Sequence, residues 1–294
     1  MLFTIPLNSN QATLELAGGK GKNLSKLLQD DIFPVPNGFI ITTESYQTFV
    51  KTNGLEDFIF QTIKEHDFSK IEKMNDKNYE KISETIRNEF CKTPFPTKLQ
   101  EDIVSSYVSL GNDVAVAVRS SATAEDLPDL SFAGQQDTYL NIYTKEQLLS
   151  NVINCFASLW TARAISYRSN AGINHKNVAL AVVVQIMVPS DSSGVLFTAN
   201  PLNDRRDQVV LEVVRGLGEA LVSGLTDPDR YILNRDGDVL DRRVGSKAVS
   251  IRPKVSIFIN LQCIELKYHV HFFLERWWDR GVKRNWNNPY LLNR

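Results

Sequence analysis

The sequence predicts a mixed α/β or α+β protein with two lobes. The first half of the 294-residue chain carries apolar residues at helical spacing, whereas short apolar runs with the texture of strands follow one another from Val178 onward. The chain is long enough for two lobes with a sizeable core. We expect a helix-rich first lobe over residues 1–180, a strand-rich second lobe over 181–251, and an atypical aromatic-rich tail over 252–294.

The first lobe begins with a glycine loop that leads into a helix. Residues 18–22 read Gly-Gly-Lys-Gly-Lys, and the leucines within 24–28 follow helical spacing. The two prolines within 33–38 predict a turn, and the apolar run over 39–42 predicts a short strand. Residues 55–110 read as mainly helical, with solvated charges between the apolar positions.

A long helix and then a series of strands are expected next. Apolar residues repeat at helical spacing over 148–168, which predicts one amphipathic helix. Apolar runs over 181–188, 194–198 and 208–214 are typical of buried strands. Residues 231–240 contain an Asp-Gly pair between two short apolar runs, which indicates a hairpin.

Bulk composition narrows the functional class. The formal charge of −1 gives no overall field to hold a polyanion, so nucleic acid is not indicated and any phosphate site must be local. Three isolated cysteines, Cys91, Cys155 and Cys263, argue against a zinc site or a disulfide framework. The sequence has neither a signal-peptide pattern at its start nor a run of about 18 apolar residues. We therefore expect a cytoplasmic protein with no membrane partner.

The most informative segment runs from Arg119 to Leu127 and continues through 131–141. It places an arginine after a β-branched run, beside the hydroxyls of Ser120, Ser121 and Thr123. A guanidinium offers a planar fork of donors, and with neighbouring hydroxyl and backbone donors it suits phosphate oxygens. The Arg-Ser-Ser triplet alone would more simply be a strand-to-helix turn with a surface arginine. The length of the whole segment favours the anion site.

The glycine loop over 18–22 offers a second phosphate contact. Its backbone N–H groups and Lys20 could surround an anion at a helix N-terminus. It is not a Walker A loop, because the pattern G-x-x-x-x-G-K-[ST] is absent. Taken alone, such a short loop is more often free of ligand.

Gln185 interrupts an otherwise apolar strand. A buried amide costs about 1–3 kcal/mol if it is unpaired, so a buried Gln185 would imply a partner. A glutamine that faces water from the edge of a sheet fits the pattern equally well.

Residues 116–141 resemble, nearly residue for residue, the signature of the N-terminal ATP-binding domain shared by phosphoenolpyruvate synthase, pyruvate phosphate dikinase and rifampin phosphotransferase. Residues 191–201 resemble that family's Ser-Gly-Val-x-Phe-Thr-x-[Asp/Asn]-Pro strand and turn. Residues 215–224 resemble its Gly-Leu-Gly-Glu turn and helix. The resemblance covers approximately residues 15–250.

The resemblance implies an ATP-grasp-like nucleotide domain of two lobes. Family members bind ATP with Mg²⁺ and pass a phosphoryl group to a histidine on a partner domain. By this likeness Lys20 and Arg119 would contact the phosphates and act in catalysis, Gly134 and Thr138 would line the nucleotide, and Gln185 would lie near the base or ribose.

The chain departs from the family after the region of Lys247. The family's acidic Asp-[Ile/Val]-Glu-Trp strand and its Gln-Ser-Arg-Pro strand, which supply metal and phosphate ligands, are not in this sequence. We therefore expect an incomplete second lobe, most Mg²⁺ ligands missing, and any phosphohistidine domain in another chain. Two functions stay open: the ATP-binding domain of a phosphotransferase or dikinase, or a nucleotide-binding pseudoenzyme or scaffold without turnover. The acceptor of the phosphoryl group stays open as well.

Overall fold

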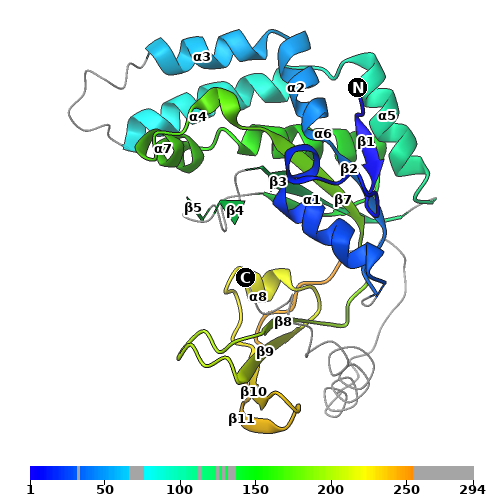
Figure 1. Ribbon diagram of the computed structural model, residues 1–294, viewed down its shortest axis with the longest axis vertical. Helices are drawn as coiled ribbons and strands as arrows, with labels where there is room; N and C mark the ends of the chain where they lie inside the picture. The colour runs from blue at the N-terminus through cyan, green and yellow to red at the C-terminus, as the bar shows by residue number, and fades with distance from the viewer. Residues whose placement is uncertain are drawn as a thin grey trace. The chain divides into compact units, whose positions relative to one another are not determined.

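The computed structural model describes residues 1–31, 34–65, 76–111, 114–123, 126–127, 130–131 and 137–253. The chain divides into two compact units, Met1–Met187 and Val188–Arg294 (Figure 1). The aromatic-rich tail expected over 252–294 therefore lies almost entirely outside the described residues.

The first unit is built on a five-stranded antiparallel sheet with the strand order β1-β2-β7-β3-β6. Its strands are β1 (Thr4–Pro6), β2 (Gly38–Ile41), β7 (Leu180–Ile186), β3 (Val116–Ala122) and β6 (Thr138–Ile142). A short separate ribbon joins β4 (Asp126–Leu127) and β5 (Leu130–Ser131).

β7 had been expected to open the second lobe, and the structure corrects this. It is the central strand of the first sheet and pairs with β2 on one side and β3 on the other. An apolar run shows that a strand is buried but not which sheet buries it. The boundary between the units consequently falls after Met187 rather than at 180/181.

Helices cover both faces of this sheet. Ala17 of α1 (Leu14–Gln29) packs with Ile40 and Val183 on one face. The other face packs against a larger core that includes the Phe49, Phe90 and Phe156 rings. The helices around that core are α2 (Thr43–Thr52), α3 (Leu55–Glu65), α4 (Asp76–Lys92), α5 (Thr97–Val108), α6 (Lys145–Ser158) and α7 (Ala162–Asn170), followed by the short 3₁₀ turn η1 (His175–Asn177).

Two helical expectations meet different outcomes. Residues 55–110, where the structure describes them, are mainly helical as expected, in α3, α4 and α5. The single helix expected over 148–168 is instead two helices, α6 and α7. The second begins because the Thr161 side chain caps it and accepts a hydrogen bond from the backbone N–H of Ala164 at 3.3 Å.

The second unit contains a four-stranded antiparallel sheet with the order β11-β10-β9-β8 (Figure 1). The expected strands and hairpin are present as β8 (Ser192–Phe197), β9 (Gln208–Arg215), β10 (Asp229–Asn234) and β11 (Val239–Arg243), with the short helix α8 (Glu219–Val222) after β9. A small core of Val209, Tyr231 and Leu233 lies on one face.

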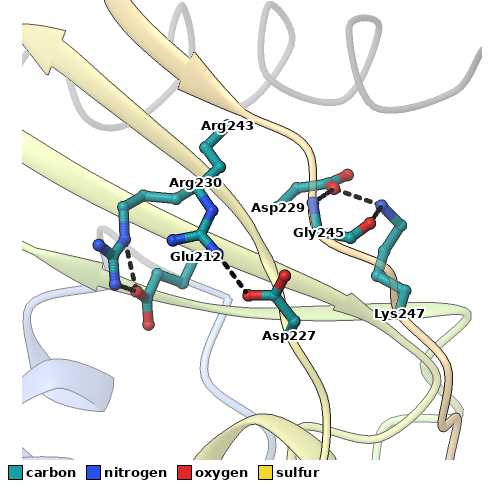
Figure 2. Close-up of polar contacts among 7 residues, drawn as sticks. All are labelled: Glu212, Asp227, Asp229, Arg230, Arg243, Gly245 and Lys247. Carbon is teal, nitrogen blue, oxygen red and sulfur yellow. Dashed lines mark hydrogen bonds and ion pairs between the residues drawn. The ribbon is translucent and has the colours of Figure 1, made fainter.

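Charged contacts hold this second sheet and the segment that follows it (Figure 2). Arg230 on β10 donates from Nε at 2.8 Å and from Nη2 at 2.6 Å to Oε1 of Glu212 on β9. After β11 the chain returns past β10, where Asp229 accepts a hydrogen bond from the Gly245 N–H at 2.9 Å and pairs with the Lys247 ammonium. Within the described part of the chain, no helix is long and apolar enough to cross a membrane.

Candidate functional site

The glycine-lysine segment is a kink inside a helix rather than a loop before one. α1 begins at Leu14, and Gly18 interrupts it with φ 67° and ψ 178°. A Cβ atom at Gly18 would lie 2.1 Å from the carbonyl oxygen of Ser121 on β3. Glycine is therefore required at this position for two reasons, the positive φ and the close approach of two backbones.

The Ser121 side chain replaces a backbone hydrogen bond that the helix lacks at this kink. Its Oγ accepts a hydrogen bond from the Gly21 N–H at 3.0 Å and donates one to the Ala17 carbonyl oxygen at 2.8 Å. In an uninterrupted helix Gly21 would bond directly to Ala17, four residues earlier. The Ser121 hydroxyl of β3 thus bridges an N–H group and a C=O group that would otherwise bond each other within α1. This bridge anchors the kink to β3.

The kink brings Lys20 to the strand that carries Arg119. Lys20 Nζ donates to the carbonyl oxygen of Ser120 at 3.1 Å, and Ser120 is the next residue after Arg119. The Arg119 side chain shares a sheet face with Ser121, since the two are separated by one residue along a strand. Because Ser121 bonds α1, that face is the one α1 covers.

Cross-strand register adds the other candidates to this face. Thr138 on β6 lies directly opposite Arg119, and Val183 on β7 lies opposite it on the other side. Opposed residues point to the same face of a sheet. Gln185, two residues beyond Val183, is opposite Ala117 and shares the face too. The structure therefore brings Lys20, Arg119 and Thr138 to one side of the sheet, with Gln185 farther along it. Gly134 lies outside the described residues.

Gln185 is buried in the central strand, so the alternative of a water-facing edge glutamine is wrong. Gln185 is only 8% exposed, and its Nε2 donates a hydrogen bond to the carbonyl oxygen of Pro36 at 3.0 Å. This contact supplies the partner that burial of the amide requires.

The hydroxyls beside Arg119 have structural roles that the sequence did not reveal. Ser121 bonds α1, Ser120 Oγ bonds the carbonyl oxygen of Asp137 at 3.2 Å, and Thr123 Oγ1 donates to that of Ala179 at 3.2 Å. They were expected to donate to phosphate beside the guanidinium. Each of these three hydroxyls is therefore hydrogen-bonded to a backbone carbonyl group of the protein.

The carboxylate next to the site is directed away from it. Asp137 precedes Thr138, so its side chain belongs to the opposite face, where Oδ2 accepts a hydrogen bond from the Tyr139 hydroxyl at 3.0 Å. Burial, and next the Asp137 charge, raise the pKa of Tyr139, so this phenol stays protonated and keeps donating.

Comparison with known proteins identifies the family of the chain. The sequence profile of the family described as "Pyruvate phosphate dikinase, AMP/ATP-binding domain" matches residues 14–257. The chain belongs to this family. Its two-unit mixed α/β architecture is the ATP-grasp-like fold of that ATP-binding domain.

Curated relatives of the pyruvate phosphate dikinase family are much longer than the matched part. A phosphoenolpyruvate synthase of Aeropyrum pernix is 45% identical over 240 residues, which cover 80% of this chain and 29% of the relative. A probable phosphoenolpyruvate synthase of Methanocaldococcus jannaschii is 42% identical, with coverage of 80% and 20%. A rifampicin phosphotransferase of Bacillus cereus is 41% identical, with coverage of 81% and 27%. The chain thus spans less than a third of the length of these relatives.

Proposed function

We propose that this chain holds the phosphates of ATP between Lys20 and Arg119 on the α1 face of the first sheet. The observation that carries the proposal is that the Gly18 kink, fixed by Ser121, directs Lys20 onto the strand of Arg119. An ammonium and a guanidinium on one sheet face suit a polyphosphate. Membership in the AMP/ATP-binding family supports a nucleotide as the source of that phosphate.

The remaining contacts follow from the positions of the other candidates. Thr138, opposite Arg119, would line the nucleotide together with Gly134. Gln185 would lie near the base or ribose, since it is farther along the same face. Its Nε2 is engaged by Pro36, so Oε1 is the amide atom we expect to face the nucleotide.

Mg²⁺ is expected to accompany ATP in this family, and we propose that the ATP phosphates and water supply more of its ligands than the described residues. They contain no group of three or more His, Cys, Asp or Glu side chains that could hold a metal ion. Divalent magnesium is normally held by one or two carboxylates together with phosphate oxygens and water. Lys20 and Arg119 would supply charge neutralisation at the phosphates and would not bind a cation.

We further propose that the chain is the ATP-binding part of a phosphotransferase or dikinase that passes a phosphoryl group to a histidine of a partner domain. The names and greater length of the relatives support this reading. In phosphoryl transfer the protein acts mainly by positioning and charge stabilisation, which are the tasks Lys20 and Arg119 could perform. The alternative is a nucleotide-binding scaffold without turnover.

Calorimetric titration with ATP, with and without Mg²⁺, tests the nucleotide site. Arg119→Ala should weaken binding roughly tenfold to hundredfold, because a charge-assisted hydrogen bond contributes about 1.5–3 kcal/mol. Arg163→Ala, which removes an exposed arginine on α7, is the matched control and should leave the affinity unchanged. Equal affinities for wild type and Arg119→Ala would refute the site.

A second assay separates the two functions. The chain is incubated with labelled ATP and a separately produced phosphohistidine domain from a full-length relative. Acid-labile label on that domain, dependent on the chain, supports the phosphotransferase. ATP binding without any transfer favours the scaffold.

A further inference from the structure

Two hydroxyl side chains from different elements bond the same turn of α1. Thr43, the first residue of α2, donates from Oγ1 to the carbonyl oxygen of Glu15 at 2.7 Å. Ser121 of β3 donates from Oγ to the carbonyl oxygen of Ala17 at 2.8 Å. Both acceptors precede Gly18, so the turn of α1 that leads into the kink is held at two of its carbonyl groups.

The Thr43 hydroxyl serves α1 rather than its own helix. A threonine at the start of a helix usually caps that helix through its side chain. The N-cap residue of α2 is Thr42, however, and its side chain makes no capping bond. Thr43 is only 5% exposed and Ser121 is fully buried. Because buried hydroxyls keep their partners, α2 and β3 are both tied to this one turn of α1.

Lys20 lies directly after the turn that the two hydroxyls hold. Ser121 Oγ also accepts a hydrogen bond from the Gly21 N–H, so this one hydroxyl bonds α1 on both sides of Lys20, at Ala17 and at Gly21. The Lys20 ammonium itself donates to the carbonyl oxygen of Ser120 at 3.1 Å. The direction in which Lys20 leaves α1 therefore depends on backbone that these side chains fix.

We propose that Ser121 and Thr43 are positioning residues for ATP, which act on its phosphates through Lys20. This inference rests on the function proposed above for Lys20. Neither hydroxyl has to touch the nucleotide, since each is bonded to the backbone of α1. A charge-assisted hydrogen bond to phosphate depends on its geometry. Loss of either hydroxyl should therefore lower the affinity for ATP without removing a protein–nucleotide contact.

Two double-mutant cycles test this on the full chain, with calorimetric titration of ATP as the measurement. Ser121→Ala and Thr43→Val should each weaken ATP binding about threefold or more in the otherwise unchanged chain. In the Lys20→Met background the same two changes should weaken binding by less than about 1.5-fold, because the side chain that they position no longer carries a charge. A hydroxyl that merely stabilises the fold would give the same loss in both backgrounds.

Ser45→Ala is the matched control on α2. Ser45 is fully buried, and its Oγ donates to the carbonyl oxygen of Phe3 at 2.6 Å, so the variant loses a hydrogen bond of the same kind that does not go to α1. Its ATP affinity should be unchanged. Thr43→Ser keeps the hydroxyl and should bind ATP as the unchanged chain does. Urea unfolding of each variant shows that it is folded, and the Thr43 cycle decides alone if Ser121→Ala does not fold.

The outcomes separate this inference from the proposed ATP site. Equal losses of affinity with and without Lys20→Met would overturn the positioning role and leave the ATP site standing. Unchanged affinities for both Ser121→Ala and Thr43→Val would do the same. An unchanged affinity for Lys20→Met would instead refute the contact of Lys20 with the phosphates, and the positioning role with it.

Discussion

The hydroxyl of Ser121 accepts a hydrogen bond from the backbone N–H of Gly21 at 3.0 Å. Helix α1 and strand β3 are thereby joined through a bond that replaces one of the helix's own, with Ala17 as the other partner. The two residues are 100 positions apart in sequence. This junction sets the direction of Lys20 relative to Arg119, so the geometry of the candidate site depends on it.

Gly18→Ala should destabilise the protein more than Gly54→Ala. Both glycines have φ 67°, where an alanine costs about 1–2 kcal/mol. Only at Gly18 would the new Cβ also meet the backbone of Ser121, at 2.1 Å, whereas nothing lies within 4 Å at Gly54. Urea unfolding of the two variants measures the difference. Equal losses of unfolding free energy would show that the Gly18 contact relaxes without cost.

Local patterns identified most of the elements but not the contacts between them. The hairpin of β10 and β11 was predicted because an Asp-Gly turn and its flanking apolar residues are adjacent in sequence. The hydrogen bonds of Ser121 to α1 were not predicted, because they depend on which strand packs beside the helix. The hydroxyls next to Arg119 suggested phosphate binding, yet a hydroxyl serves equally well as a partner for buried backbone.

Lys20→Met should weaken ATP binding about tenfold, and Lys22→Met should leave it within about twofold. Lys20 reaches the Ser120 carbonyl beside Arg119, while Lys22, two residues along α1, is exposed. Methionine keeps a side chain of similar length and removes the charge. Calorimetry on both variants measures the two ATP affinities. The salt concentration is kept the same, because salt screens the attraction of both lysines for phosphate. A larger loss for Lys22→Met would place the phosphates elsewhere.

The His175 imidazole should make stability depend on pH. Arg168, which is 1% exposed, donates from Nε to His175 Nδ1 at 3.0 Å and lies 5.1 Å from the centre of the Trp160 ring. His175 Nε2 faces Ser169 Oγ at 3.3 Å. Accepting from Arg168 requires a neutral ring. Burial, and then the Arg168 charge, lower the pKa of His175 from 6.5 to about 4.

Because the folded-state pKa of His175 is the lower one, the unfolded chain binds more protons between about pH 6.5 and pH 4. The stabilisation is complete above pH 6.5 and is lost as pH falls through this window. Because one proton is involved, the free energy of unfolding changes by at most about 1.4 kcal/mol per pH unit. The partial exposure of the ring reduces this slope. His175→Gln keeps an acceptor for Arg168 but does not titrate, so its unfolding free energy should fall less steeply. Parallel curves for both proteins would assign the acid sensitivity to other groups.

Asp229→Asn should destabilise the second unit far more than Asp207→Asn. Asp229 is 6% exposed and bonds both the Gly245 N–H and the ammonium of Lys247, whose own backbone is held at φ 46° (Figure 2). Removing one partner of a buried pair leaves an uncompensated charge and costs about 3 kcal/mol. Asp207 pairs with Arg205 on the surface, where the side chains are 61% and 55% exposed, and such pairs contribute less than about 1 kcal/mol.

The double variant Asp229→Asn/Lys247→Met distinguishes the cause of that loss. If the uncompensated ammonium of Lys247 dominates, removing it as well should recover part of the unfolding free energy lost in Asp229→Asn, although the Gly245 contact stays weakened. Urea unfolding of the four proteins in this cycle gives the coupling between the two side chains. A double variant as unstable as the sum of the single ones would mean that Asp229 acts through Gly245 alone, and that the returning segment is held by its backbone rather than by the ion pair.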